Sequence, residues 1–266
     1  MKGIDGSTSM IALTREPSAS LAAGERTHRA REPIDVALAA RQHEGYRRAL
    51  AECGARVTTL PALDGFPDAV FIEDVALVLD EFAVLFPMGA RSRREEPAMT
   101  VAEIARWREV VPLPDDACAE GGDIVRLGRT LYVGRTGRTH DGGIAALGEV
   151  ATPHGYRVVP VEVAGCLHLK SACTALDDDT LLANPAWVDP SAFEAERTIE
   201  VDPDEPDAAN AVRVGGSVLL QAGCPRTIER VTAAGFDARA VDVGELAKAE
   251  GSLTCLSLLF EEQAGG

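Results

Sequence analysis

Several features that would assign a function class at once are missing from this sequence. It has no run of about 18 apolar residues that could span a bilayer. Its beginning, MKGIDGSTSMIALTREPSASLAAG (1–24), lacks the apolar core of a secretory signal peptide. Six cysteines are scattered along the chain without a C-x-x-C pair, which argues against a disulfide framework. These absences predict a cytoplasmic protein with reduced thiols and no membrane partner.

Positive charge is also scarce. The chain carries 26 Lys and Arg against 42 Asp and Glu, a formal net charge of −16. Nucleic acids and acidic membranes recruit basic patches, so we expect neither as a partner, whereas a small cationic substrate is compatible with this balance. The segment GRTGRTHDGG (134–143) is neither a G-x-G-x-x-G fingerprint nor a Walker loop, so no nucleotide cofactor is expected.

The sequence does contain a repeating order of predicted elements. A unit of two strands, a helix and another strand recurs about every 50 residues, which is typical of propeller-like or repeated architectures. A doubly wound sheet would instead alternate single strands with helices. No low-complexity linker interrupts the pattern, so one domain over residues 1–266 is expected. The predicted helices cover 32–57, 94–110, 139–155 and 224–236, and the β-runs cover 68–89, 122–135, 156–165, 180–188, 211–223, 238–243 and 255–260.

Cys255 lies in EGSLTCLSLLF (250–260), close to the C-terminus. A free cysteine is more often an inert apolar side chain than a nucleophile, so a reactive role requires a base elsewhere. His168, in AGCLHLKSACT (164–174), is a candidate if it lies on a strand that turns it away from Leu167 and Leu169. Zinc is the rival interpretation, but Cys166, His168 and Cys173 lack the paired spacing of common zinc sites and a fourth ligand.

Acidic residues interrupt two otherwise apolar or glycine-rich segments. Glu73 and Asp74 stand inside a predicted β-run, where neighbouring residues point to opposite faces, so at least one of them is expected to be buried. A buried carboxylate needs hydrogen-bond donors or a cation, which leaves a structural role and a guanidinium or ammonium pocket both open. Glu120 precedes Gly121-Gly122 and is compatible with a solvated loop or with a histidine partner.

Two arginine-containing segments complete the set of candidates. The segments 90–96 and 134–143 carry arginines beside turn residues. These arginines are interpreted either as surface charge or as a bidentate clamp on a substrate carboxylate.

Taken in order, short segments of the chain resemble the dimethylarginine dimethylaminohydrolase family of the guanidino-group-modifying (pentein) superfamily. The resemblance runs from Ser20 to Phe260, and although each segment is weak alone, the ordered set is specific. The family fold implies a five-bladed α/β propeller of ββαβ modules. The segments are SL (20–21), FPDAVFIEDVALV, GARSRREE, AEGGDI, YVGRTGRT, LHLKS, AAN (208–210), AGCPRT and GSLTCLSL.

The resemblance implies a role for each matching catalytic residue. Cys255 corresponds to the family's nucleophile, His168 to its general acid and base, and Glu120 to the carboxylate that partners the histidine and the substrate. No metal and no organic cofactor is implied.

The resemblance also implies a set of substrate contacts. The acidic pair Glu73 and Asp74 would bind the guanidinium, Asp68 would lie near the amine, and two arginines would hold the α-carboxylate. Two further residues would offer backbone carbonyls, one of them on a flexible lid. The full substrate set is therefore Leu21, Asp68, Glu73, Asp74, Arg93, Arg138 and Ala249.

Two segments depart from the family pattern, namely LFPMGA (85–90) and AEGSLTC (249–255). They affect the expected substrate preference more than the reaction class. The implied reaction is hydrolysis of asymmetric dimethylarginine or monomethylarginine to citrulline and an alkylamine through a covalent thiouronium on Cys255. The alternatives are an arginine deiminase-like hydrolase of another arginine derivative, or a non-catalytic amino-acid-binding relative. The expected partner is a small-molecule substrate, with a homodimer left open.

Overall fold

The computed structural model describes residues 9–263, and statements about the structure refer to this range. The first eight residues, on which part of the signal-peptide argument depends, lie outside it. No helix among the described residues is both long and apolar enough to cross a bilayer.

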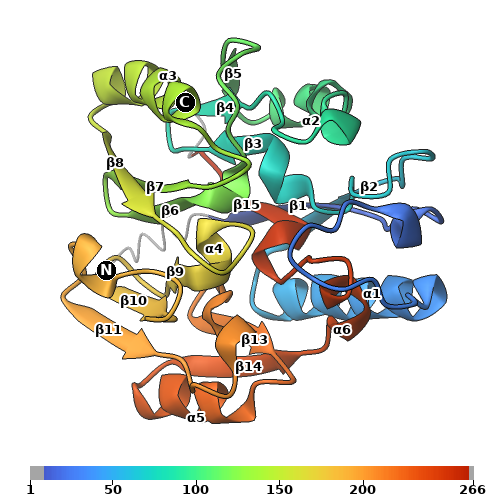
Figure 1. Ribbon diagram of the computed structural model, residues 1–266, viewed down its shortest axis with the longest axis vertical. Helices are drawn as coiled ribbons and strands as arrows, with labels where there is room; N and C mark the ends of the chain where they lie inside the picture. Colours follow the sequence, from blue (N-terminus) through green and yellow to red (C-terminus); the bar gives the residue numbers. More distant parts are fainter. Residues whose placement is uncertain (1–8, 264–266) are drawn as a thin grey trace, which may run out of the picture.

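The chain forms five small three-stranded sheets arranged in a ring (Figure 1). In each sheet the central strand pairs antiparallel with one neighbour and parallel with the other. A helix or helical turn joins the two parallel strands, so each sheet is one ββαβ module and the predicted propeller is confirmed. The sheets are β15-β1-β2, β3-β4-β5, β6-β7-β8, β9-β10-β11 and β12-β13-β14.

The strands are short and evenly distributed along the chain. Their bounds are β1 Met10–Arg15, β2 Arg56–Leu60, β3 Ala76–Val78, β4 Phe82–Leu85, β5 Glu109–Pro112, β6 Ile124–Leu127, β7 Thr130–Arg135, β8 Arg157–Glu162, β9 Cys173–Ala175, β10 Thr180–Ala183, β11 Arg197–Glu200, β12 Val212–Val214, β13 Ser217–Gln221, β14 Asp237–Val241 and β15 Ser257–Glu261.

The helices lie mainly at the rim of the ring, and the shorter helical turns lie in the loops (Figure 1). The α-helices are α1 Val36–Glu52, α2 Val101–Ile104, α3 Asp141–Ala151, α4 Leu169–Ala172, α5 Pro225–Ala233 and α6 Gly244–Ala247. The 3₁₀ turns are η1 Leu21–Ala23, η2 Ile72–Val75, η3 Arg91–Arg93, η4 Pro97–Met99, η5 Gly121–Asp123, η6 Thr152–His154, η7 Pro190–Ala192, η8 Pro206–Ala209 and η9 Thr254–Leu256.

Five apolar clusters fill the spaces between neighbouring sheets. Each central strand contributes alternate side chains to the two clusters on either side of it, because strand side chains point to opposite faces with a period of two. In β7, for example, Leu131 and Val133 face one cluster and Tyr132 faces the next. The central strands are therefore buried on both faces, which explains their continuous apolar runs.

The ring is closed by the two ends of the described chain. β15 pairs antiparallel with β1, with Met10 opposite Glu261 and Thr14 opposite Ser257. Ile11 and Phe260 are both buried in the cluster between this sheet and the β3-β4-β5 sheet. The first module is therefore assembled from residues more than 200 positions apart in the sequence.

Two predicted helices are shorter than expected. The helix expected at 94–110 is reduced to η4 and α2, and Glu109 already belongs to β5. The physical reason lies at its start, where Pro97 begins η4 and Glu96 turns inward to a buried ion pair with Arg93. The helix expected at 32–57 begins at Val36, because Asp35 caps it through the Leu38 N–H, and residues 56–60 form β2.

The three strand segments expected to carry site residues are also corrected. Glu73 and Asp74 lie in the turn η2, His168 is the residue before α4, and Cys255 lies in η9 rather than in β15. Each turn immediately precedes the first strand of a module, where the chain enters the sheet from the centre of the ring. The prediction merged these turns with the apolar strands that follow them.

Candidate active site

A short helical turn precedes the first strand of every module, and these five turns pack against one another. η2 contacts η5 and η9, while α4 contacts η5 and η8. Because each turn enters the ring at the same end, polar residues that are far apart in sequence converge there. Four of the five turns carry or adjoin residues that the sequence singled out: Glu73 and Asp74 on η2, Glu120 before η5, His168 before α4 and Cys255 on η9.

A small pocket lies where these turns meet. Its free space is about 20 Å³, and 11 residues line it. Seven of the ten predicted site residues are among them: Asp68, Asp74, Arg93, Arg138, His168, Ala249 and Cys255. The other lining residues are Glu25, Phe71, Leu167 and Glu250. Glu120 is reached from this pocket through His168, whereas Leu21 and Glu73 are placed elsewhere.

His168 and Glu120 form a buried pair. His168 Nε2 lies 2.7 Å from Glu120 Oε2, and Glu120 is fully buried. Burial acts to lower the pKa of His168, but the carboxylates of Asp74 and Asp123 and the hydrogen bond to Glu120 raise it to about 9. Burial is the largest single effect and acts to raise the pKa of Glu120, but the hydrogen bond to His168 and the nearby positive charges together lower it to about 2. Near neutral pH the pair is therefore imidazolium and carboxylate, with His168 able to donate a proton.

The remaining oxygen of Glu120 and the backbone beside His168 are also held. Glu120 Oε1 accepts the Gly89 N–H at 3.1 Å and the Arg138 Nη1–H at 3.4 Å. Asp123 Oδ1 accepts the Leu169 N–H at 2.9 Å, which fixes the start of α4. Asp123 is fully buried and was not predicted, although the acid in AEGGDI directly before an apolar strand is a usable signal.

The Gly121-Gly122 pair allows the turns to approach one another. A Cβ on Gly122 would lie 2.8 Å from both Asp74 Oδ1 and His168 Nδ1, and a Cβ on Gly121 would lie 2.1 Å from the Glu73 carbonyl oxygen. The Gly122 N–H also donates to Asp74 Oδ1 at 3.2 Å. Only glycine fits at these two positions without displacing the acidic and imidazole groups.

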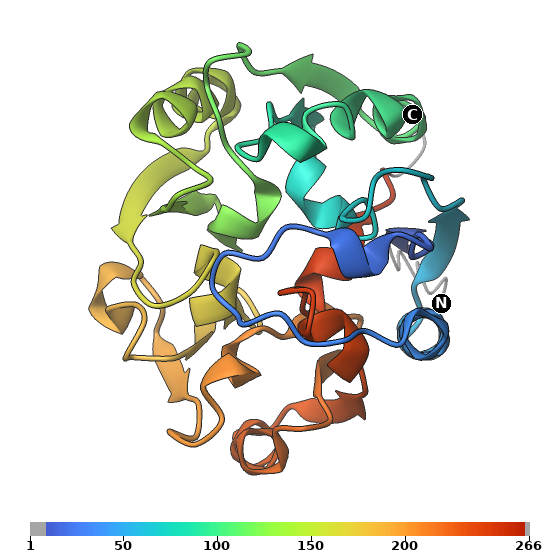
Figure 2. The ribbon, with the colours of Figure 1, turned by 45° about the vertical axis from the view of Figure 1, so that its right-hand side comes forward.

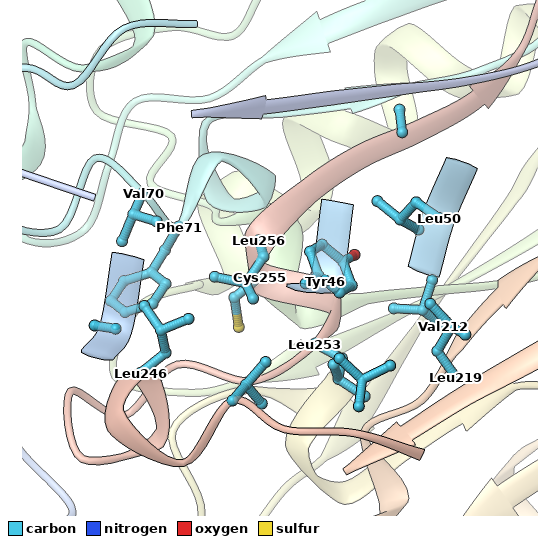
Figure 3. Close-up of a cluster of buried hydrophobic side chains, with 14 of the residues drawn as sticks. Tyr46, Leu50, Val70, Phe71, Val212, Leu219, Leu246, Leu253, Cys255 and Leu256 are labelled. Carbon is cyan, nitrogen blue, oxygen red and sulfur yellow. The ribbon is translucent and has the colours of Figure 1, made fainter. Parts of the chain in front are cut away.

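Cys255 is part of an apolar cluster, beside Phe71, Leu246 and Leu256 (Figure 3). Burial raises the pKa of its thiol, and the carboxylates of Asp74 and Glu73 raise it further. The thiol is therefore neutral in the unliganded protein at neutral pH.

Asn210 fixes the turn that carries Cys255. Its Oδ1 accepts the Thr254 N–H at 3.0 Å, and its Nδ2 donates to Thr254 Oγ1 at 2.9 Å and to the Lys170 carbonyl at 3.0 Å. One buried amide thus ties η9 to α4, and with them Cys255 to His168. Asn210 belongs to the AAN segment of the family resemblance, and the sequence predicted no role for it.

Arg93 and Arg138 differ in how many hydrogen bonds their guanidinium groups make to other protein groups. Arg93 donates from Nη1 to Asp74 at 2.6 Å, from Nε and Nη2 to Glu96 at 3.0 and 2.8 Å, and from Nη2 to the Phe71 carbonyl at 2.9 Å. Among the described residues, the Arg138 guanidinium makes only the 3.4 Å contact with Glu120 already described. Arg93 therefore positions Asp74, and Arg138 is the more available guanidinium of the two.

Glu73 and Asp74 are neighbours in sequence, but their side chains line different cavities. Asp74 lines the Cys255 pocket, whereas Glu73 accepts from Lys170 Nζ at 2.5 Å and lines a different cavity of about 220 Å³ together with Lys170 and Thr254. Burial raises the pKa of Glu73, and Lys170 partly offsets this effect. The structure does not bring Glu73 to the predicted guanidinium site.

Of the predicted backbone and amine contacts, Asp68 and Ala249 line the pocket, whereas Leu21 lies in the neighbouring apolar cluster. Leu21 is fully buried in the cluster that contains Ala249 and Cys255, and its carbonyl accepts the Gly24 N–H at 3.2 Å. Asp68 Oδ2 accepts the Glu25 N–H at 2.9 Å. Burial raises the pKa of Asp68, while Arg93 acts in the opposite direction.

Potential metal ligands lie close together at this site. Within residues 9–263, the grouped donor atoms that lie within 4.8 Å of one another belong to Asp74, Glu120 and His168. These groups already share hydrogen bonds with Arg93, Gly122 and each other. Cys166 and Cys173, the other members of the zinc alternative, are not in this group.

Comparison with known proteins assigns the family. The family model described as N,N dimethylarginine dimethylhydrolase, eukaryotic, matches residues 12–172. The dimethylarginine dimethylaminohydrolase of Streptomyces coelicolor is 40% identical over 254 residues, which cover 94% of this chain and 97% of that protein. The enzyme of the same name from Pseudomonas aeruginosa is 33% identical, covering 93% and 98% of the two chains.

Solved structures agree. A cysteine-to-serine mutant of the Pseudomonas aeruginosa enzyme complexed with citrulline is 31% identical, with a TM-score of 0.89 over 95% of this chain and 99% of that chain. A histidine-to-glycine variant of dimethylarginine dimethylaminohydrolase, solved as an adduct with S-methyl-L-thiocitrulline, also gives a TM-score of 0.89 at 32% identity, covering 95% and 100% of the two chains. From its sequence and its propeller fold alike, this chain belongs to the dimethylarginine dimethylaminohydrolase family.

Proposed function

We propose that the protein hydrolyses asymmetric dimethylarginine or monomethylarginine to citrulline and an alkylamine. The observation that carries the proposal is the His168 imidazolium, held by the buried Glu120, in the same pocket as Cys255 and Asp74. A guanidinium is a delocalised cation and a poor electrophile. Its hydrolysis needs carboxylates to orient it, a nucleophile to attack carbon and an acid to release the amine, and this pocket contains one group for each task.

The chemistry would proceed in two halves. Asp74 and Glu120 bind guanidinium nitrogens, and the bound cation lowers the pKa of the Cys255 thiol, which loses its proton to solvent. The thiolate sulfur then forms a bond to the central carbon. His168 gives its proton to the departing amine as the C–N bond breaks, which leaves a thiouronium on Cys255. The neutral imidazole then takes a proton from water, the hydroxide adds to the same carbon, and the C–S bond breaks to give citrulline and the cysteine thiol.

Charged side chains of the pocket lining would hold the amino-acid end of the substrate. Asp68 is the proposed ligand of the α-ammonium, and Arg138 is the principal ligand of the α-carboxylate. Arg93 completes the carboxylate site while it holds Asp74 in position. Leu21 and Ala249 offer backbone carbonyls, as the family resemblance implies.

The test is citrulline formation from asymmetric dimethylarginine, monomethylarginine, arginine and agmatine. The two methylated amino acids should be turned over, with dimethylamine or methylamine as the second product. Agmatine, which lacks the carboxylate, should be a very poor substrate. Ammonia release from arginine at a higher kcat/KM would favour the deiminase-like alternative, and binding without turnover would favour the non-catalytic one.

Variants connect this activity to the proposed residues. Arg138→Ala should raise KM strongly, because losing a charged hydrogen bond to a carboxylate costs on the order of 2–3 kcal/mol. Cys255→Ser should abolish turnover while the fold is retained, whereas Cys53→Ser and Cys118→Ser should keep activity. Retention of even about a tenth of wild-type kcat by Cys255→Ser would contradict the covalent route.

The cellular setting is part of the same proposal. We propose a cytoplasmic enzyme that acts on the free amino acid, with thiols kept reduced by that compartment. Light scattering of the purified protein would establish whether it is a monomer or the homodimer left open by the sequence.

A further inference from the structure

A strap of chain, defined here as residues 20–31, runs between β1 and α1 across the middle of the ring (Figure 2). It begins with η1 and contributes Glu25 to the pocket lining. Two carboxylates from other parts of the ring bind its backbone, and both of them line the pocket. The first is Asp68 and the second is Glu250.

The Asp68 contact holds the first half of the strap. Asp68 Oδ2 accepts the Glu25 N–H at 2.9 Å, and a Cβ on Gly24 would lie only 2.3 Å from Asp68 Oδ1. The strap therefore approaches Asp68 more closely than any residue but glycine allows at that point. Glu25 is also held from its side chain, because Ser92 Oγ donates to Glu25 Oε1 at 2.6 Å.

The Glu250 contact holds the second half. A single oxygen, Glu250 Oε1, accepts both the His28 N–H at 2.7 Å and the Arg29 N–H at 2.6 Å. Two short bonds from consecutive backbone amides to one carboxylate oxygen are charge-assisted and specific in direction. The Arg29 side chain adds an ion pair with Asp207 at 2.5 Å, but both side chains are more than 40% exposed, so this pair contributes little.

The backbone of Glu250 is unusual. Its φ is +63°, and it is the one non-glycine residue with positive φ that the structure records between residues 9 and 263. A side chain in the left-handed region costs free energy and persists where the surroundings hold it. Glu250 follows Ala249, which lines the pocket, and precedes Gly251, where a Cβ would lie 2.0 Å from the Phe71 ring.

We propose that Glu250 is a positioning residue that clasps the strap over the pocket and thereby sets the affinity for the amino-acid substrate. The proposal rests on the proposed function for its substrate. The contacts between Glu250 and the strap do not depend on the proposed function, because they join the strap to the loop that carries Ala249. Burial acts to raise the pKa of Glu250, but the backbone N–H groups of the strap hold it below the ordinary value, so the clasp is charged at neutral pH.

Three variants at this position separate hydrogen bonding from backbone strain. Glu250→Gln keeps the Oε1 acceptor and so should retain the clasp. Glu250→Ala removes the acceptor and leaves the strained backbone, whereas Glu250→Gly removes the acceptor and also relieves the strain, so it guards against a folding defect in the alanine variant. Glu149→Ala, at an exposed position of α3, is the matched control.

Two readouts need no turnover. The strap carries Arg26, Arg29 and Arg31, so an opened strap should be cut by trypsin, and the amides of His28 and Arg29 should exchange faster with solvent. We expect both rates to rise about tenfold in the alanine and glycine variants, the size expected for losing hydrogen bonds to a charged group. The glutamine variant and the control should match the wild type within about threefold.

Kinetics then connects the clasp to the substrate. With asymmetric dimethylarginine, the alanine and glycine variants should raise KM about tenfold while kcat changes by less than about threefold. The proposal is overturned if the alanine and glycine variants have the same amide exchange rates, trypsin resistance and KM as the wild type. A glutamine variant that behaves like the alanine variant would overturn it as well. If no variant and no wild type turns over any arginine derivative, the proposed function fails, while exchange and trypsin still decide the clasp.

Discussion

At the scale of single residues, the pocket combines a raised thiol pKa with a raised imidazole pKa. Reactive cysteines usually lie in electropositive surroundings that lower the thiol pKa. Here burial is the largest effect that raises the pKa of Cys255, and the charges of Asp74 and Glu73 raise it further, so Cys255 is held as a thiol. A cationic substrate placed between Asp74 and Glu120 would neutralise these carboxylates. Substrate binding would then help to form the nucleophile that attacks it.

The thiolate absorbance of Cys255 against pH measures this effect. In the free protein the Cys255 signal should appear only above the ordinary cysteine range, at a pH greater than about 8.5. A cationic ligand that cannot react should shift the titration downward, because it removes the repulsion that disfavours the thiolate. Cys255→Ser supplies the blank. A free-protein pKa below about 7, or no downward shift with ligand, would contradict substrate-assisted activation.

His168 and Glu120 make a stability prediction with a definite sign. Because the folded pKa of His168 is raised to about 9, its contribution to stability is fully present below the unfolded value of 6.5 and is lost as the pH rises through about 9. Denaturant unfolding between these two pH values should therefore show a falling free energy of unfolding. Glu120→Gln removes the principal hydrogen-bond partner, so it should lower the His168 pKa and flatten the decline. An equally steep decline in Glu120→Gln would show that another group is responsible.

At the scale of elements, the turns that precede the first strand of each module position the site residues. The sequence pattern alone does not predict these turns. Residues 68–89 and 255–260 are predicted as β-runs, and His168 is considered on a strand, because the apolar residues of each strand follow its turn directly. The turns form because partners distant in sequence hold them, for example Asp123 at Leu169 and Asn210 at Thr254. The residue pattern within one segment contains no information about partners that are distant in sequence, so it cannot predict these turns.

Elements with local signals were predicted better. The hairpin around residues 122–135 has Gly128 at a φ of +54° in its turn, and α5 begins with Pro225. Each of these signals acts within a few residues, so the sequence alone reveals it. The strand β11 (Arg197–Glu200) was missed, because only Ile199 in it is buried and no alternation is visible.

The site residues were identified by the family resemblance, not by local pattern. Position in the ring decides which of them face the pocket. Asp74 and Glu73 are adjacent in sequence, yet one lines the pocket and the other pairs with Lys170. The residues that sequence reasoning missed, Asp123, Asn210 and Glu250, all act on backbone N–H groups of other turns or loops. Such roles depend on three-dimensional neighbours.

A pair of glycine variants tests the packing of the turns. Gly122→Ala places a methyl group 2.8 Å from Asp74 Oδ1 and His168 Nδ1, so it should lower kcat by at least about a hundredfold, since small misplacement of reacting groups has effects of that size. Gly148→Ala, in α3, meets nothing within 4 Å and should keep activity while adding up to about 1 kcal/mol of stability. Wild-type kcat in Gly122→Ala would contradict the close approach described here.

At the scale of the whole molecule, the ring depends on strands from both ends of the described chain. Five interfaces between sheets hold the modules together, and two of them include side chains of β15, which follows the turn of Cys255 directly. Opening the ring at β1-β15 would therefore release the nucleophile from its partners. Closure thus couples global stability to the integrity of the site.

Phe260→Ala tests this coupling. Phe260 is 6% exposed and packs in the cluster next to β1, so its truncation should cost about 3–5 kcal/mol of unfolding free energy. Leu259→Ala, at a half-buried position on the same strand, should cost less and is the comparison. Activity should be lost at the same denaturant concentration as the fold in both variants. Activity that survives the loss of β-sheet signal would contradict closure as a requirement for the site.

The central claim, that Cys255 attacks the amidine-type carbon of an arginine-like substrate, has one most direct test. His168→Gly protein is incubated with S-methyl-L-thiocitrulline and analysed by peptide mass spectrometry. Methanethiolate leaves without needing protonation, and the missing imidazole slows the hydrolysis that follows, so a covalent adduct should accumulate. The account predicts this adduct on the peptide that contains Cys255 and none in the double variant with Cys255→Ser. An adduct on another cysteine, or none on Cys255 although the ligand binds, would contradict it.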